Sequence, residues 1–288
     1  MKRNPGPVYA APLALWLTTL FAVPLVIILL YSFMVKGTYG GVVARFSLDG
    51  YRALFNPTFV AAALSTLLIA TVSSVCMVLL ALPAAYHMAR SRHKNVYLLL
   101  VIIPFWTNFL IRIYAWIAIL GNNGFLNMFL VHIGILADPV QFLYNRNAVI
   151  LVTVYTYLPY AILPLYSSIE KFDGSLLEAA RDLGAGVVQS TFRVLLPSIR
   201  GGIVTAILFT FIPVFGAYAI PQILGGSDSL MLGTVIAREL TVTRNWPLAA
   251  SVSMLLTVVT TTGVVMLARY NRSATPDDGK SAKEGSGT

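Results

Sequence analysis

Six long stretches of the chain are almost free of charged residues, and this pattern restricts the fold more than any other feature. A helix needs about 20 apolar residues to cross the hydrocarbon core of a bilayer. The six stretches are residues 4–35, 53–89, a run that begins after Lys94 and is interrupted only by Arg112, 147–169, 201–227 and 245–268. They predict an all-α integral membrane protein of about six transmembrane helices.

Composition agrees with this prediction. Hydrophobic residues make up 57% of the 288 residues and charged residues only 11%, whereas a soluble domain carries about 25% charged residues. The net charge is +9, but the basic residues flank the apolar runs and form no stripe of their own. We therefore expect contact with membrane lipid and none with nucleic acid. The single cysteine, Cys76, excludes an intramolecular disulfide framework.

The first apolar stretch follows Lys2 and Arg3, as the core of a secretory signal peptide would. It is longer than a typical signal core and shows no small-residue cleavage site. We interpret it as an uncleaved membrane anchor.

Basic residues set the expected orientation, because cytoplasmic loops carry an excess of Lys and Arg. With six spans, both termini lie on one side, which holds thirteen basic residues: Lys2, Arg3, Arg90, Arg92, Lys94, Lys171, Arg181, Arg193, Arg200, Arg269, Arg272, Lys280 and Lys283. The other side holds six: Lys36, Arg45, Arg52, Arg146, Arg238 and Arg244. Both termini are therefore expected in the cytoplasm. The predicted organisation is a cytoplasmic N-terminus (1–9), a membrane domain (10–268) and a disordered cytoplasmic tail (269–288).

The sequence contains no pattern typical of a catalytic or metal-binding site. His87, His93 and His132 are scattered, and none has metal-ligand spacing to Cys, Asp or Glu. No nucleophile–base–acid set lies within a span. The sequence thus predicts neither a catalytic site nor a metal site, and any use of ATP requires another chain to bind it.

The predicted cytoplasmic loop 170–200 contains a short amphipathic helix. Ser175 and Glu178 have the spacing of a capping box, which marks a helix start. An apolar face then repeats with helical period over Leu176, Leu177, Ala180, Leu183 and Gly184. The helix is too short and too charged to cross a bilayer, and Pro197 interrupts the chain before the fifth span. Taken alone, the periodicity also fits a loop helix that rests on lipid, with Glu178 as a plain capping residue.

The same loop resembles the EAA motif of binding-protein-dependent ABC importer permeases. The matching residues are Glu178, Ala179, Ala180, Gly184, Val194, Leu195, Leu196 and Pro197, with isoleucine usual in the family where Val194 stands. In that family the motif forms a coupling helix that docks on the ATP-binding subunit. The resemblance implies a type I ABC importer permease architecture. It also implies an ATPase-docking role for Glu178, Ala179, Ala180, Asp182, Gly184 and Pro197.

The resemblance extends over residues 45–268. The segments PFWTNFLIRIYAW, LPLYSSIEKFDGSLLEAARDLGA, IPQILGG and NWPLAAS are similar to the first permease subunit of spermidine/putrescine importers. This likeness implies a polyamine substrate and no cofactor on this chain, since ATP and Mg are bound by the partner ATPase. The implied partners are a second permease subunit, two ATP-binding subunits and a periplasmic substrate-binding protein.

Two alternatives stay open at this stage. One is an importer for another small solute, such as a phosphonate, thiamine or an iron complex. The other is a non-transport membrane protein whose surface helix docks a partner. Whether two copies pair or a distinct permease is needed is also left open.

Aromatic residues, not acidic ones, mark the expected translocation pathway, because no Asp or Glu lies within the six spans. Aromatic rings attract ammonium groups by about 2 kcal/mol when both are desolvated, although ordinary packing explains most of such residues. The candidates for pathway or gate are Trp106, Asn108, Arg112, Tyr155, Tyr160, Phe215 and Tyr218.

Arg112 is the one basic residue within a predicted span. Such a charge costs roughly 2.5–3.5 kcal/mol at mid-bilayer, so it normally faces a cavity or a partner. Arg112 follows Lys94 by enough residues to lie towards the periplasmic end, where it can snorkel to the interface. Snorkelling or structural pairing and a gating role are the two hypotheses.

Prolines also fall within predicted spans. Pro159 and Pro164 lie in the fourth span, and Pro213 with Gly216 in the fifth. Broken helices in transporters mark hinges or pathway positions, but a static kink fits equally well.

Overall fold

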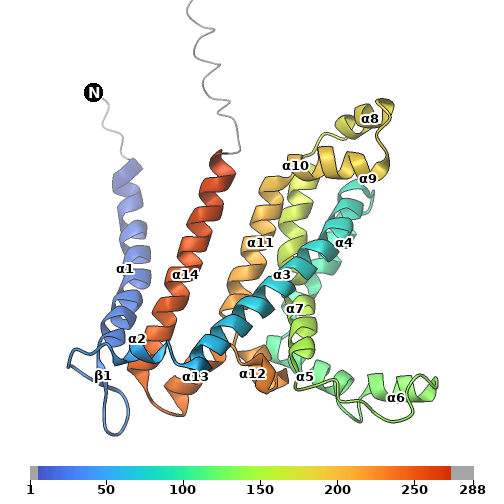
Figure 1. Ribbon diagram of the computed structural model, residues 1–288. Coiled ribbons are helices and arrows are strands. Elements are labelled where there is room, and N and C mark those ends of the chain that lie inside the picture. The colour runs from blue at the N-terminus through green and yellow to red at the C-terminus, as the bar shows by residue number, and fades with distance from the viewer. Residues whose placement is uncertain (1–5, 274–288) are drawn as a thin grey trace, which may run out of the picture. The chain divides into compact units, whose positions relative to one another are not determined.

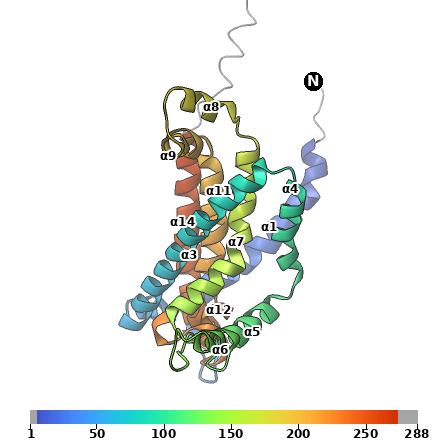
Figure 2. The ribbon, with the colours of Figure 1, turned by 90° about the vertical axis from the view of Figure 1, so that its right-hand side faces the viewer.

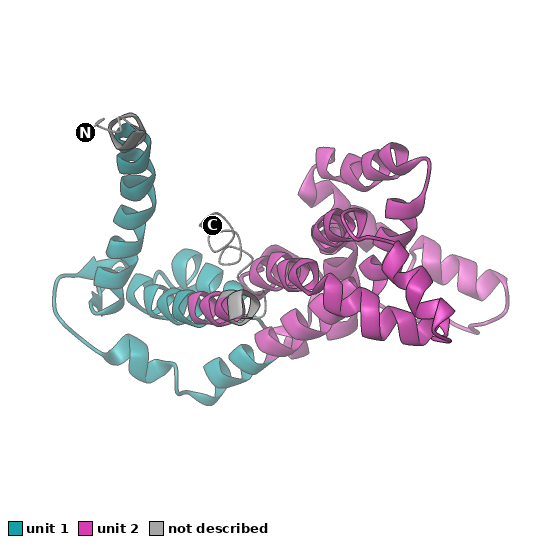
Figure 3. Ribbon diagram, turned by 90° about the horizontal axis from the view of Figure 1, so that it is seen from above, with its two compact units in different colours: residues 1–64, 231–259 teal, residues 65–230, 260–288 magenta. Residues whose placement is uncertain are grey.

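The computed structural model describes residues 6–273, which fold almost entirely into helices (Figure 1). The chain divides into two compact units: residues 1–64 with 231–259, and residues 65–230 with 260–288 (Figure 3). Two long helices, α3 (Pro57–Arg90) and α14 (Trp246–Ser273), run from one unit into the other. Because α14 continues to Ser273, only residues 274–288 of the predicted tail, like residues 1–5, lie outside the described part of the chain.

The first unit combines α1 (Gly6–Ser32), α2 (Asp49–Ala53) and α13 (Leu232–Thr241) with parts of α3 and α14. Its helices meet through small polar groups. The Ser251 hydroxyl donates to the Ser32 carbonyl at 3.1 Å, and the hydroxyls of Ser32 and Tyr51 are 2.8 Å apart. From residue 11 onwards, the apolar side chains of α1 are mostly exposed, as expected for a helix that faces lipid.

A two-stranded hairpin lies in the same unit. Strands β1 (Val35–Lys36) and β2 (Val42–Val43) pair antiparallel. Gly40 and Gly41 have φ of 96° and 79°, a region that only glycine adopts freely. The Gly41 N–H donates to the Arg244 carbonyl at 3.1 Å, so the hairpin tip is held on the turn between α13 and α14.

The core of the second unit is the pair α7 (Arg146–Glu170) and α11 (Arg200–Phe215), which is the most extensive helix contact in the described chain (Figure 2). Val149, Val152 and Leu165 of α7 are fully buried. Gly202 of α11 lies directly against Ser168 of α7, where a side chain would collide. Small residues at such positions let membrane helices approach closely. Pro159 and Pro164 lie within α7 without ending it.

The remaining elements of the second unit are short. They are α4 (Lys94–Ile102), η1 (Ile103–Trp106), α5 (Phe109–Leu120), α6 (Phe125–His132), α8 (Ser175–Asp182), α9 (Val187–Ser190), η2 (Thr191–Leu195), α10 (Leu196–Ser198), α12 (Ala219–Leu224) and η3 (Ser227–Ser229). In both side views α8 lies at one end of this unit, and α5 and α6 lie at the other (Figures 1 and 2).

The expected membrane spans are confirmed with two corrections. Five helical segments are long and apolar enough to cross a bilayer: Ala11–Ser32, Pro57–Arg90, Phe109–His132 (α5 with α6), Arg146–Glu170 and Trp246–Leu267. A sixth span arises if Val187–Ser198 and Arg200–Phe215, bent by 73°, count as one. The run after Lys94 is not one straight helix. Pro104 lies in a 3-10 turn, and the chain is extended at Thr107 before α5 begins.

The fifth predicted span is also shorter than expected. Helix α11 ends at Phe215, where Gly216 follows, and the chain turns before α12. At 1.5 Å per residue α11 is about 24 Å long, less than the roughly 30 Å of a hydrocarbon core. The bend at its start lies at Ile199, two residues after Pro197. The predicted interruption by Pro197 is thus close to the observed one.

Candidate functional site

Helix α8 is the predicted loop helix, and its two ends are closed by different devices. At the start, the Asp173 carboxylate accepts the Ser175 backbone N–H at 2.9 Å. The capping box expected between Ser175 and Glu178 is wrong, since Ser175 is already helical and Asp173 supplies the acceptor. This hydrogen bond, followed by the Ser175 side chain and the nearby Arg90 charge, lowers the pKa of Asp173 below its usual value.

At the other end, Gly184 closes α8 with a Schellman motif. The Gly184 N–H donates to the Arg181 carbonyl at 2.8 Å, and the Ala185 N–H donates to the Ala180 carbonyl at 3.0 Å. Gly184 has φ of 86°, with open space where a Cβ would stand. Sequence reasoning assigned Gly184 to close docking, and the structure adds this backbone requirement. An eight-residue helix is marginal in isolation, so both end contacts define the shape of α8.

The predicted apolar face of α8 divides into an inner and an outer part. Leu177 is 5% exposed and Ala180 is half-buried, whereas Leu183 is 89% exposed. A groove of about 270 Å³ runs beside Ala180 and Leu183, and its other wall includes Gln189, Arg193 and Val194. The end of α8 and the following turn therefore expose a large apolar side chain beside a groove with both apolar and polar lining residues.

The structure adds residues to this outer surface that sequence reasoning missed. Val187 and Val188 of α9 and Phe192 of η2 are exposed next to α8 along the chain. The apolar run between Asp182 and Arg193 could have indicated these residues. Gly184 and Gly186 interrupt its helical periodicity, so the run does not stand out as one apolar face. We call the exposed set Leu183, Val187, Val188 and Phe192 the α8–η2 surface.

Of the other residues predicted to dock the ATPase, Glu178, Ala179 and Asp182 are exposed on α8, and Pro197 is exposed on α10. Within residues 6–273, neither Glu178 nor Asp182 has a side-chain hydrogen bond or an ion pair. Both carboxylates are thus available to a partner.

The predicted pathway residues do not form one site. Arg112, Tyr155 and Tyr160 lie along the α5–α7 side of the second unit. Tyr155 meets Trp116 edge to face with ring centroids 5.3 Å apart, and Tyr160 meets Phe105 in the same way at 5.1 Å. Phe215 instead stacks on Phe211 at 5.2 Å within α11 and is 6% exposed, so it is a packing residue.

Three other predicted pathway residues, Asn108, Trp106 and Tyr218, lie at the ends of helices. Asn108 is the N-cap of α5, and its Oδ1 accepts from the Leu110 N–H at 2.8 Å and the Ile111 N–H at 3.4 Å. Its side chain therefore holds the helix start. Trp106, at the end of η1, and Tyr218, before α12, are largely exposed.

Arg112 lies near the start of α5, at the end of the second unit opposite α8. Its Cζ is 5.9 Å from the centroid of the Phe109 ring, and it is close enough to Tyr157 for an electrostatic interaction. The Nε atom is buried and has no hydrogen-bond partner among the described residues. Residues 6–273 thus provide Arg112 with an aromatic neighbour but no ion pair.

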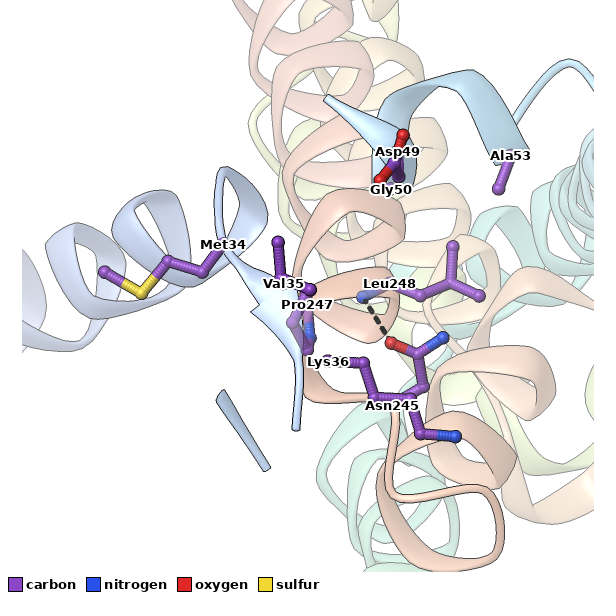
Figure 4. A pocket seen from close by; sticks show the side chains of 9 residues that line it. All are labelled: Met34, Val35, Lys36, Asp49, Gly50, Ala53, Asn245, Pro247 and Leu248. Atoms are coloured by element: carbon purple, nitrogen blue, oxygen red, sulfur yellow. Dashed lines mark hydrogen bonds between the residues drawn. The ribbon is translucent and has the colours of Figure 1, made fainter. Parts of the chain in front are cut away.

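A further pocket, of about 180 Å³, lies in the first unit between the hairpin, α2 and the start of α14 (Figure 4). Lys36, Asp49 and Asn245 are its polar lining residues. The Asn245 Oδ1 accepts the Leu248 N–H at 3.3 Å, which turns the amide towards the helix start. No sequence prediction fell on this pocket.

Residues 77–273 match the family model described as "Binding-protein-dependent transport system inner membrane component". The spermidine/putrescine transport system permease protein PotB of Haemophilus influenzae is 38% identical over 259 residues, covering 89% of this chain and 91% of that protein. PotB of Escherichia coli K12 is 36% identical over 260 residues, covering 90% and 94%. The chain belongs to this family of binding-protein-dependent transport components.

The fold of solved transporters agrees. A crystal structure of a bacterial ABC transporter for import of alginate contains a chain that matches with a TM-score of 0.74 at 18% identity, covering 94% of this chain and 96% of that one. Its family membership makes the chain an inner-membrane, multi-pass permease subunit of an ABC importer. It is not an enzyme, and it works with a separate ATPase and a solute-binding protein.

Proposed function

We propose that this permease carries small linear polyamines, putrescine and spermidine, as half of a translocation pathway. The observation that supports the substrate is the 36–38% identity to PotB proteins over 89–90% of the chain. Importers of phosphonates, thiamine or iron complexes share the architecture and are the alternative.

The aromatic residues on α5 and α7 support a cationic substrate. Tyr155 and Tyr160 are partly exposed, and each has an aromatic neighbour from another element. Ring faces attract ammonium groups without a fixed negative charge. A polyamine can thus pass without being held tightly, while a separate binding protein provides most of the selectivity.

We propose that α8 and the α8–η2 surface dock on the ATPase. Leu183 lies outside every candidate span of the described residues and is exposed, as apolar side chains at protein interfaces are. The carboxylates of Glu178 and Asp182 are free to meet basic groups of a partner. Both caps give α8 a defined shape before docking, which lowers the ordering cost of the contact.

The full importer, in this proposal, contains a second permease subunit, two ATP-binding subunits and a periplasmic binding protein. The N-terminus (1–9), the loop 170–200 and the tail (269–288) face the cytoplasm, and residues 10–268 form the membrane domain. The thirteen-to-six distribution of Lys and Arg supports this orientation.

The test of the substrate is uptake of labelled putrescine in cells that lack other polyamine importers. We expect uptake when this chain is produced with its partner subunits, competition by spermidine, and loss of uptake when the partner ATPase cannot hydrolyse ATP. Assembled complex that hydrolyses ATP yet takes up neither polyamine would overturn the substrate assignment.

A further inference from the structure

The segment between α7 and α8 is held at both ends by residues from the corner where α3 ends and α4 begins. At one end, Lys94 Nζ, on the first residue of α4, lies 2.7 Å from Glu170 Oε1, on the last residue of α7. The Tyr166 hydroxyl donates to the same carboxylate oxygen at 2.9 Å. The start of α4 is therefore tied to the point where the chain leaves α7 for α8.

At the other end, Arg90, the last residue of α3, lies against Gly174, the residue before α8. A Cβ on Gly174 would stand 2.5 Å from Nη1 and 3.1 Å from Cζ of Arg90. The Arg90 Cζ is also 5.9 Å from the Tyr86 ring centroid. The guanidinium thus occupies the space that any larger residue at 174 would need.

Backbone conformation does not require glycine at this position. Gly174 has φ of −66° and ψ of −22°, ordinary right-handed helical angles that alanine adopts more readily than glycine. The absence of a side chain at Gly174 therefore serves to let Arg90 approach closely.

We propose that Arg90 and Lys94 act as a two-point clamp that positions α8 relative to α3 and α4. This inference rests on the proposed docking of α8 to the ATPase. A displacement of α8 then reaches α3 through Gly174 and α4 through Glu170. Helix α4 leads in turn to η1 and the extended link at Thr107. The clamp residues are positioning residues, because they act on transport through α8.

Stability is not what the clamp supplies. The Lys94 and Glu170 side chains are 47% and 38% exposed, and ion pairs of such exposure contribute little to folding. Their loss should leave the chain inserted and folded while it loosens the mechanical link.

The test compares two glycine variants in the complete complex, reconstituted in proteoliposomes with its binding protein. Gly174→Ala displaces the Arg90 guanidinium. Gly186→Ala is the matched control, because φ is −66° there and nothing lies within 4 Å of the added methyl. We expect Gly174→Ala to lower putrescine transported per ATP hydrolysed about fivefold, the lower range of allosteric coupling, with ATPase association unchanged. Gly186→Ala should leave the ratio unchanged.

A double-mutant cycle assigns the effect to Arg90. Arg90→Ala should cause the same loss of coupling, and adding Gly174→Ala to it should cause none further. Arg90→Lys should restore part of the ratio. Lys94→Glu and Glu170→Lys should each reduce coupling and together recover it.

Normal coupling in both Gly174→Ala and Arg90→Ala would overturn the clamp, as would equal losses in both glycine variants or fully additive losses in the double variant. If the unaltered complex hydrolyses ATP but carries no putrescine, only the substrate proposal fails. Stimulation of the ATPase by the binding protein then replaces uptake as the readout. If substitutions in α8 leave ATPase binding unchanged, the docking proposal is refuted, and the clamp proposal fails with it.

Discussion

At the α8 end of the second unit, apolar side chains face outwards from a helix whose end groups are satisfied within the chain. At the α5 end, a basic side chain is half-buried beside aromatic rings and has no counter-charge among the described residues. The first arrangement is suited to docking of a preformed surface. The second needs a counter-charge that the described residues do not supply, either from a partner or from the molecules that pass.

This difference between the two ends also predicts which substitutions should have the largest effects on assembly and on transport. A docking surface loses its partner when its shape changes, because the contact depends on complementarity over several residues. A residue that modulates passage alters a rate, while the complex still assembles. Variants at the two ends should therefore separate assembly from transport.

The largest effect is expected from Gly184→Trp. The indole adds bulk where the chain leaves open space, so it leaves the interior intact and obstructs docking. We expect loss of ATPase co-purification and of uptake, more than tenfold each, since several apolar contacts of about 1 kcal/mol are lost together.

Gly184→Ala is the control for Gly184→Trp, because it imposes the same left-handed backbone strain of about 1–2 kcal/mol without the bulk. It should retain most ATPase binding. Equal losses in both variants would assign the effect to the cap of α8, and normal ATPase binding by Gly184→Trp would refute docking at this surface.

An intermediate effect is expected from Arg112→Ala. No ion pair of Arg112 with another described residue is broken, so the complex should assemble in normal amounts. Loss of a cation–π contact of about 1 kcal/mol corresponds to roughly a fivefold change in uptake or basal ATPase rate.

Arg112→Lys keeps the charge, so its uptake and basal ATPase rates should lie between those of Arg112→Ala and those of the unaltered chain. A reduced amount of assembled complex in Arg112→Ala would favour structural pairing with another subunit. Normal assembly together with normal transport would remove Arg112 from the pathway.

The same two ends of the second unit show which features can be predicted from the sequence and which cannot. Helix α8 was predictable because its apolar period, its glycine and its EAA resemblance lie within one short segment. The clamp was not, because Arg90, Lys94 and Glu170 come from different helices and the basic residues among them served only to predict orientation. At the other end, the sequence identified Arg112 but not the break before it. Asn108 was predicted as a pathway residue, and the structure adds that its carboxamide caps α5.

The six spans were predictable because charge-free runs of sufficient length have few alternatives in a bilayer. Their interruptions were predictable in the fifth span, where Pro197 and Gly216 lie beside the observed breaks, but not in the third and fourth. Helix α7 contains two prolines and continues, since α11 packs tightly along it. The run after Lys94 contains one proline and breaks, at a place where Trp106 and Thr107 are exposed. Tertiary packing decides whether a helix continues through a proline or breaks there, and this packing cannot be read from a single sequence.

The smallest effect is expected from pH acting on Asp173 at the α8 end. Its pKa is lowered, so the carboxylate form is favoured in the folded protein. The stabilisation is present above the ordinary pKa of an aspartate and is lost only as pH falls through the lowered value. ATPase coupling should therefore show no dependence on this group between about pH 5.5 and 8. Asp173→Asn keeps an oxygen acceptor for the Ser175 N–H and should change coupling less than about twofold, whereas Asp173→Ala removes the cap and should lower coupling further. Rates of ATP hydrolysis and uptake measured across that pH range check this order. A loss in Asp173→Asn as large as that in Asp173→Ala would show that the charge facing Arg90, and not the cap, orients α8.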